Sequence, residues 1–270
     1  MNGSRNWVFL GDSLTEGVGS KRISHVTELA KQLRASEFRL RPIETRNGYV
    51  DFNVAGLMNV AAEQHDLWLW NLACEGKTIE SDFEWLPLIG TLRPELVVVF
   101  RGTLESIVRP VMLRNGAWPW WVPRSWRTYS AMDPRCYFST TWWRKAKQTS
   151  VDALKQKARL KLLKLEAGKP LMEVEKFAQY QRELLQQLRA LGARVVVLGL
   201  LPIGEARFPD SPAYFKTVNG KLKEVADAAG AEFLDWASLL PANAEAFYRD
   251  GLHPNETGAR ALAEILRQAL

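Results

Sequence analysis

Short apolar runs alternate with helix-forming stretches along this chain, and this alternation restricts its fold more than any other feature. Runs of four to six apolar residues are typical of strands that are buried on both faces. They lie at 7–10, 67–72, 96–100 and 195–200, with a weaker run at 231–234. Helical periodicity covers 23–33, 177–191, 218–229 and 257–270. The pattern predicts a single α/β domain over residues 1–270, built on a doubly wound parallel sheet of about five strands.

Three short segments with polar or glycine residues follow directly after predicted strands. They are Gly-Asp-Ser at 11–13, Ala-Cys-Glu-Gly at 73–76 and Arg-Gly-Thr at 101–103. Because sites in open parallel sheets form at the carboxyl ends of the strands, we expect the three segments to meet at one edge of the sheet. Asn71, at the end of its strand, is expected to pin the turn that follows through side-chain hydrogen bonds.

Ser13 is the strongest candidate for a nucleophile. It lies on a tight turn between a buried strand and a helix, where the helix N-terminus offers backbone N–H groups to an oxyanion. The same position also suits a helix N-cap, which Ser and Asp both favour. A serine hydroxyl is weak alone and needs a base, usually a histidine that a carboxylate orients.

Of the three histidines in the chain, one has the setting of such a base. His253 follows Asp250 by three residues on a turn before a predicted helix, and at that spacing both side chains can lie beside Ser13. The other two, His25 and His65, have no strand-edge setting, and His25 is predicted on a polar helix face.

The motifs at the two ends of the chain, Gly-Asp-Ser-Leu at 11–14 and Asp-x-x-His at 250–253, resemble those of the GDSL, or SGNH, hydrolases. The segment Asn-Leu-Ala-Cys-Glu-Gly-Lys-Thr at 71–78 is similar to the second block of that family, with Gly76 as its glycine. The segment at 198–202 also matches in type and order.

The resemblance covers residues 5–103 and 171–270, and it implies a flavodoxin-like sheet and a serine esterase or acyltransferase. In such an enzyme Ser13 attacks an acyl carbonyl and carries the acyl group as an intermediate. His253 acts as general base and then as general acid, and Asp250 orients His253. No cofactor takes part.

The resemblance also implies an oxyanion site, and here the sequence departs from the family. The backbone N–H groups of Ser13 and Gly76 would be two of the donors. The third donor in the family is the Asn of a Gly-x-Asn-Asp block, but the matching segment here is Gly-Thr-Leu-Glu, and Leu104 cannot donate. Losing one donor typically costs about 10²–10³ in rate. The candidates to fill this position are Arg101, Thr103 and Asn115. Leu104 in place of Asn would also fit an enzyme that is slow on simple esters, or one that transfers the acyl group to an acceptor other than water.

Residues 104–170 are interpreted as an insertion between a strand and the helix that follows it. The segment 101–170 carries 15 Lys and Arg against 4 Asp and Glu, a net charge of +11, whereas the rest of the chain carries −5. Six of the eleven tryptophans lie in this segment, and 155–165 is predicted as a basic amphipathic helix. The candidate substrate-binding residues are Trp118, Trp120, Trp121, Trp142 and Trp143.

Three roles for the insertion stay open. It is a lid whose aromatic rings stack on sugars or hold an acyl chain, a surface that lies on an anionic membrane or polysaccharide, or an arm for packing or partner binding. No nucleic-acid-binding module is visible, so nucleic acid is not an expected partner.

The sequence therefore predicts an enzyme that hydrolyses or transfers O-acyl groups, with O-acetyl groups of a carbohydrate as the first choice. The alternatives are a lipase, lysophospholipase or thioesterase with a membrane-docking insertion, and a catalytically impaired binding protein. The last alternative rests on Leu104, which stands where the family has its Asn.

No cluster of His, Cys and Asp has metal-ligand spacing, so neither a metal nor a cofactor is expected. The first apolar run is too short for a signal peptide, and no run of about 18 apolar residues is present. The expected location is the cytoplasm, with peripheral membrane contact as an option.

Overall fold

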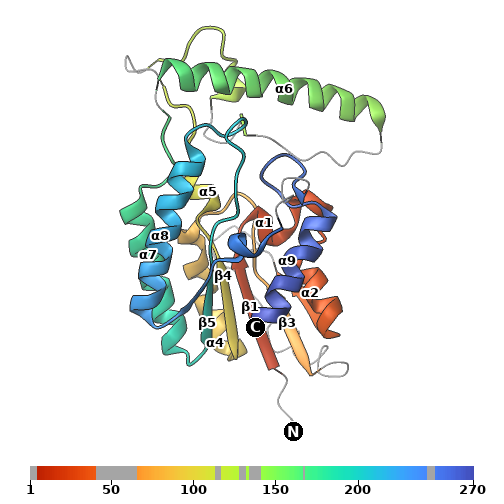
Figure 1. Cartoon of the computed structure of the whole chain (residues 1–270), viewed down its shortest axis with the longest axis vertical. Helices are drawn as coiled ribbons and strands as arrows, with labels where there is room; N and C mark the ends of the chain where they lie inside the picture. Colours follow the sequence, from red (N-terminus) through yellow and green to blue (C-terminus); the bar gives the residue numbers. More distant parts are fainter. Residues whose placement is uncertain are drawn as a thin grey trace, which may run out of the picture.

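The structure, a computed structural model, describes residues 5–40, 66–112, 117–127, 132–133, 141–166, 168–241 and 247–270. Within these residues, six parallel strands form one sheet with helices on both sides (Figure 1). The predicted α/β class and parallel sheet are confirmed, with one strand more than the five expected. His65 and Asn115 lie outside the described residues.

The strands are ordered β2-β3-β1-β4-β5-β6 across the sheet. Their bounds are Arg5–Gly11 for β1, Ser36–Arg39 for β2, Leu67–Asn71 for β3, Leu96–Phe100 for β4, Arg194–Leu198 for β5 and Glu232–Leu234 for β6. Five of them coincide with the apolar runs of the sequence. The sixth, β2, has the sequence Ser-Glu-Phe-Arg and lies at the edge of the sheet, where it is only partly buried. An edge strand needs no apolar run, and this is why periodicity does not find it.

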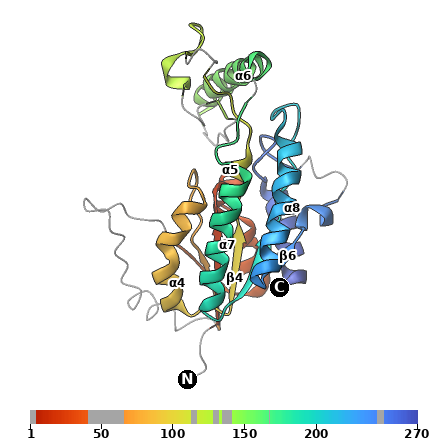
Figure 2. The same cartoon turned by 90° about the vertical axis from the view of Figure 1, so that its left-hand side faces the viewer.

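The helices lie on both sides of the sheet. On one side α7 packs against α8, and on the other α2 packs against α9 (Figures 1 and 2). The α-helices are α1 (Ser13–Glu16), α2 (His25–Leu33), α4 (Leu86–Leu92), α5 (Thr103–Ser106), α6 (Trp142–Leu165), α7 (Val174–Ala190), α8 (Ser211–Ala229) and α9 (Glu256–Ala269). Short 3₁₀ helices are η1 (Val18–Ser20), η2 (Ile79–Trp85), η3 (Arg124–Trp126) and η4 (Trp236–Leu239).

The prediction that His25 lies on a polar helix face is wrong. His25 and Leu29 are one turn apart on the buried side of α2, so the histidine belongs to the apolar stripe of the helix. Its ring meets Trp236 and Phe100 edge to face, with centroids 5.2 and 6.3 Å away. Burial lowers the pKa of His25 to about 3, so the ring is neutral at physiological pH.

The strand register brings the three predicted segments to one edge of the sheet. Gly11, the last residue of β1, pairs with Phe100, the last residue of β4, and Phe9 pairs with Asn71, the last residue of β3. The segments that follow these strands therefore start side by side. The N–H of Cys74 donates to the carbonyl of Gly11 over 3.1 Å, which ties two of them together directly.

A backbone bridge joins the two ends of the segment that the sequence predicts as an insertion, residues 104–170. Arg109 and Lys169 face each other in an antiparallel bridge and exchange two backbone hydrogen bonds of 2.9 Å. The buried guanidinium groups of Arg109 and Arg159 both pair with Asp133, over 2.9 and 2.6 Å. A small apolar core inside the insertion contains Val122, Met132, Ala158 and Leu162, with Trp118, Trp121 and Trp126 packed around it.

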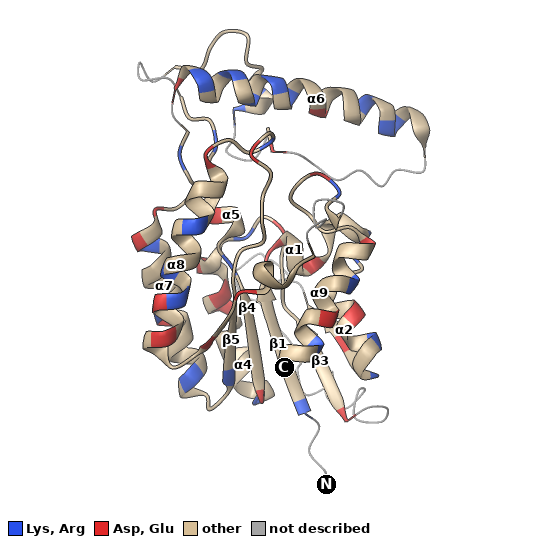
Figure 3. Cartoon of the chain, viewed as in Figure 1, with Lys and Arg blue, Asp and Glu red and all other residues tan. Residues whose placement is uncertain are grey.

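Helix α6 crosses above the carboxyl-end edge of the sheet, away from the core of the domain (Figures 1 and 2). The predicted basic helix at 155–165 is its second half, and residues 142–151 of the first half are all exposed. Lysines and arginines are distributed along its whole length (Figure 3). Among the described residues, none of the helices has both the length and the apolarity needed to cross a bilayer.

Candidate active site

Ser13, His253 and Asp250 form a continuous chain of hydrogen bonds at the sheet edge. The Oγ atom of Ser13 is 2.9 Å from Nε2 of His253. The other ring nitrogen, Nδ1, is 2.8 Å from Oδ2 of Asp250. This is the geometry in which a histidine can take a proton from a serine hydroxyl while a carboxylate fixes its tautomer. The serine and the histidine are 240 positions apart in the sequence, so only the fold brings them together.

Ser13 is the first residue of α1, and its neighbour Asp12 is the N-cap. The Oδ1 atom of Asp12 accepts the N–H of Leu14 over 3.0 Å, so the capping role belongs to Asp12 and leaves the Ser13 hydroxyl to His253. Gly19 lets the histidine loop approach this turn, because a Cβ atom at position 19 would lie 2.7 Å from the Cβ of His253.

Asp250 holds both the ring and the backbone of His253. While Oδ2 contacts the ring, Oδ1 accepts the N–H groups of Leu252 over 3.0 Å and of His253 over 2.8 Å. Burial lowers the pKa of His253, but the charge of Asp250 and its hydrogen bond outweigh that effect, so the pKa lies above the ordinary 6.5.

Gly76 lies on the loop after β3 with φ of +73°, a conformation that favours glycine. A Cβ atom at this position would meet nothing within 4 Å, so the loop faces open space. Asn71 pins the start of the loop by accepting the N–H of Ala73 over 3.2 Å, which confirms its predicted role.

Glu16 ties the same loop to the nucleophile turn, and sequence reasoning missed it. This buried residue stands one turn after Ser13, and its Oε2 atom accepts the N–H of Glu75 over 2.7 Å. Its other oxygen pairs with Arg22, which also contacts Glu75. The sequence does contain a hint of this role, because Glu16 is a charged residue directly after the nucleophile turn.

Arg101, directly after β4, has its guanidinium engaged by other groups and is not available as an oxyanion donor. The guanidinium is buried, forms an ion pair with both oxygens of Asp82, and donates to the carbonyl of Lys77 over 2.7 Å. It thereby anchors the loop that carries Gly76. The hydroxyl of Thr103 is also buried, and it makes no hydrogen bond to any described residue.

Glu105, two residues further on, is buried and was not singled out from the sequence. Its Oε1 atom accepts the N–H of Ile79 over 2.7 Å, and burial raises its pKa to about 7. Loss of hydration is the main cause of the higher pKa, and it outweighs the opposing charge of Arg101.

The five tryptophans proposed from the sequence fall into two groups. Trp118 and Trp121 pack against the small core of the insertion. In contrast, Trp120, Trp142 and Trp143 have exposed fractions of 92%, 61% and 67%, and the last two stack on each other with centroids 3.5 Å apart.

Arg207 links helix α6 of the insertion to the loop that carries Asp250 and His253. Gln156 of α6 donates to the carbonyl of Arg207 over 2.8 Å, and Arg207 in turn donates to the carbonyl of Asp250 over 2.9 Å. The position of α6 is thus linked to the loop that carries the candidate base.

The raised pKa of His253 leads to a prediction about pH. A general base must be neutral, so kcat/KM for p-nitrophenyl acetate should fall as the pH drops through a midpoint above 6.5. In Asp250→Asn the amide oxygen can still accept the two backbone N–H groups, but the charge is gone, so the midpoint should move to lower pH and the rate should drop at least about tenfold. Glu105→Gln is the control, since Glu105 also titrates near 7. A midpoint that moves in the control and stays in Asp250→Asn would contradict the assignment.

Comparisons with known proteins identify the family and the fold. The model of the GDSL-like Lipase/Acylhydrolase family matches residues 9–261. The acetyl xylan esterase AlAXEase is similar over 98% of this chain and 99% of its own, with 14% identity and a TM-score of 0.57. LAE5, an alpha/beta hydrolase from the metagenome of Lake Arreo in Spain, is similar over 100% of this chain and 97% of its own, with 16% identity and a TM-score of 0.53. The acetylxylan esterase Axe2 from Geobacillus stearothermophilus is similar over 98% of this chain and 94% of its own, with 14% identity and a TM-score of 0.52. At such identities the likeness shows the fold. A comparison with curated proteins finds no match.

Proposed function

This chain belongs to the GDSL-like Lipase/Acylhydrolase family, and we propose that it is a serine esterase that removes O-acetyl groups from a carbohydrate. The observation that carries the proposal is the hydrogen-bonded chain from Ser13 through His253 to Asp250, with distances of 2.9 and 2.8 Å. The family membership supports the esterase chemistry, and the choice of acetyl and carbohydrate is our own inference.

In the proposed reaction, Nε2 of His253 takes the proton of the Ser13 hydroxyl while Oγ attacks the carbonyl carbon of the ester. The N–H groups of Ser13 and Gly76 stabilise the oxyanion that forms. The intermediate collapses, the C–O bond to the sugar breaks, and protonated His253 gives its proton to the leaving hydroxyl. Water, activated by the same histidine, then attacks acetyl-Ser13 and releases acetate. A sugar hydroxyl in place of water would make the reaction a transfer.

We propose the hydroxyl of Thr103 as the third oxyanion donor. Its buried hydroxyl has no hydrogen-bond partner among the described residues, and it directly precedes Leu104, where the family has its Asn. A buried hydroxyl without a partner costs free energy, so a transient acceptor such as an oxyanion offers it compensation.

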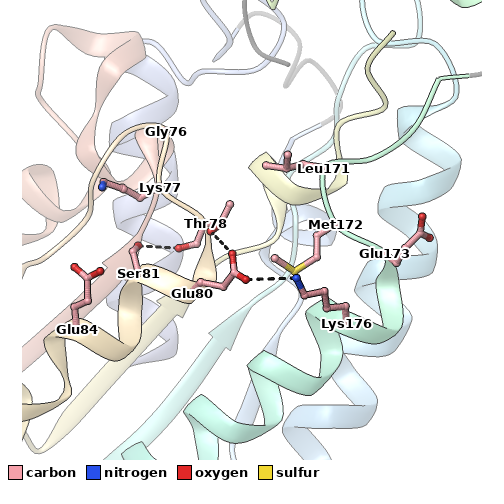
Figure 4. Close-up of a pocket in the computed structure, with 10 residues that line it drawn as sticks. All are labelled: Gly76, Lys77, Thr78, Glu80, Ser81, Glu84, Leu171, Met172, Glu173 and Lys176. Carbon is pink, nitrogen blue, oxygen red and sulfur yellow. Dashed lines mark hydrogen bonds and ion pairs between the residues drawn. The ribbon is translucent and has the colours of Figure 1, made fainter. Parts of the chain in front are cut away.

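Two observations favour acetyl groups on sugars. Two of the structurally similar proteins are acetyl xylan esterases. The described surroundings of Gly76 are rich in polar side chains, as Figure 4 shows, which suits a hydroxylated substrate better than a fatty acyl chain.

A second candidate is an esterase of lipids that docks on an anionic membrane through the insertion. It rests on exposed Trp120, Trp142 and Trp143 together with the basic side chains of α6. Tryptophan at the interface and Lys or Arg near headgroups are typical of peripheral membrane contacts.

A series of p-nitrophenyl esters separates the two candidates. If the enzyme is an acetyl esterase, kcat/KM should fall at least about tenfold from acetate to octanoate, because a site shaped for a two-carbon acyl group leaves no room for more methylenes. Acetate release from acetylated xylo-oligosaccharides should accompany this preference, with Ser13→Ala as the blank. A rate that rises with chain length would contradict the proposal and support the second candidate.

A further inference from the structure

A cavity of 590 Å³ lies directly beside Gly76, between η2 and the start of α7 (Figure 4). This volume is within the range of about 300–1,000 Å³ that small-molecule sites occupy. Because Gly76 lines the cavity and also carries a proposed oxyanion donor, an ester whose carbonyl is held at Gly76 can extend directly into this space.

The cavity is lined mainly by polar side chains. The hydroxyl of Thr78 donates to Glu80 over 3.1 Å, and that of Ser81 donates to the carbonyl of Thr78 over 2.8 Å. Lys176, from α7, pairs with Glu80 over 3.5 Å across the cavity (Figure 4). Hydroxyl, carboxylate and ammonium groups can exchange such hydrogen bonds for bonds to sugar hydroxyls. A hydrocarbon chain would displace water from these groups and offer them no hydrogen bond in return.

Glu105 fixes both walls of this cavity. Its carboxylate accepts the N–H of Ile79, the first residue of η2, over 2.7 Å. Its backbone carbonyl accepts the N–H groups of Leu171 and Met172, over 2.9 and 3.2 Å, and these two residues line the opposite wall. The cavity is therefore preformed, and the wall containing Leu171 and Met172 follows directly after the base of the insertion.

We propose that this cavity is the subsite that binds a neutral sugar residue next to the scissile acetyl ester. The inference rests on the proposed function and adds where the sugar lies and which charge it carries. Three carboxylates line the cavity against two ammonium groups, so an acidic sugar would meet net repulsion. The carboxylates are Glu80, Glu84 and Glu173, and the ammonium groups are Lys77 and Lys176.

The test compares two substrates in the full chain. The neutral probe is a mixture of acetylated xylo-oligosaccharides, and the small probe is p-nitrophenyl acetate. The variant Glu80→Ala/Lys176→Ala removes the ion pair without a change in net charge, and Ser81→Phe narrows the cavity. The matched control is Lys223→Ala/Asp227→Ala, which removes a similarly exposed ion pair of 2.7 Å on α8.

We expect the ratio of kcat/KM for the oligosaccharides to kcat/KM for p-nitrophenyl acetate to fall at least about tenfold in either cavity variant, as expected when a site loses groups that bind substrate hydroxyls. The control should keep the wild-type ratio. A ratio within twofold of wild type in both cavity variants would overturn the subsite. Failure of the proposed function looks different, because the wild-type protein would then show no turnover of p-nitrophenyl acetate that depends on Ser13.

Discussion

Ser13→Ala lowers kcat for p-nitrophenyl acetate by about 10⁴-fold or more, the largest effect that we expect from any single change in this protein. The reason is that Oγ is the atom that forms the covalent bond to the acyl group, and nothing else in the chain of hydrogen bonds can take its place. The two backbone donors and the substrate contacts remain, so a small residual rate above that of water is expected.

A fluorophosphonate probe gives an independent measurement, because it reacts with an activated serine whatever the natural substrate is. The wild-type protein should be labelled at Ser13, and His253→Ala should be labelled far more slowly, since the base is missing. Ser238→Ala, a change at an exposed serine, serves as the matched control and should behave like wild type. Turnover of p-nitrophenyl acetate at the wild-type rate in Ser13→Ala would show that the ester bond is cleaved elsewhere.

The sequence predicts the sheet well because the central strands are buried on both faces. Val97 and Val98 in β4 and Val196 and Val197 in β5 have almost no exposed surface, so burial demands the apolar runs that periodicity detects. The edge strand β2 is only partly buried and therefore leaves no such signal.

The candidate triad is predictable for a different reason. The order of strand, tight turn and helix determines where Ser13 lies, and the short Asp-x-x-His spacing determines that Asp250 and His253 share one turn. What the sequence does not contain is the distance between these two turns. It follows from packing of α9 against α2, and from the close approach that Gly19 permits.

Buried carboxylates are the part that sequence reasoning misses. Glu16 and Glu105 look like surface residues of short helices, because charged side chains are rarely buried without partners. Both are buried because each accepts a backbone N–H from a distant loop, Glu75 in one case and Ile79 in the other. Such pairings depend on the tertiary fold, so the local pattern does not show which loop each carboxylate binds.

The pair of Arg101 and Asp82 gives the second large prediction. Both side chains are almost completely buried, with exposed fractions of 1% and 0%, and they are joined through two hydrogen bonds. Asp82→Asn keeps the shape of the side chain but leaves the guanidinium without its main counter-charge. Removing one partner of a buried ion pair costs about 3–5 kcal/mol. Since Asp12 and Glu105 also lie close enough to stabilise the charge of Arg101, we expect about 3 kcal/mol, the low end of this range.

Urea unfolding should therefore show a lower midpoint with an unchanged slope, and the melting temperature should fall by about 6–12 °C. Activity adds a second readout below that temperature. Arg101 also holds the carbonyl of Lys77 over 2.7 Å, so a displaced guanidinium loosens the loop of Gly76 and lowers kcat for p-nitrophenyl acetate. Asp227→Asn removes the charge of an exposed carboxylate paired with Lys223 and should change stability by no more than about 0.5 kcal/mol. If Asp82→Asn were as stable as this control, the other contacts of Arg101 would be enough to hold it in the fold. That result would contradict the proposal that the ion pair anchors the loop of Gly76.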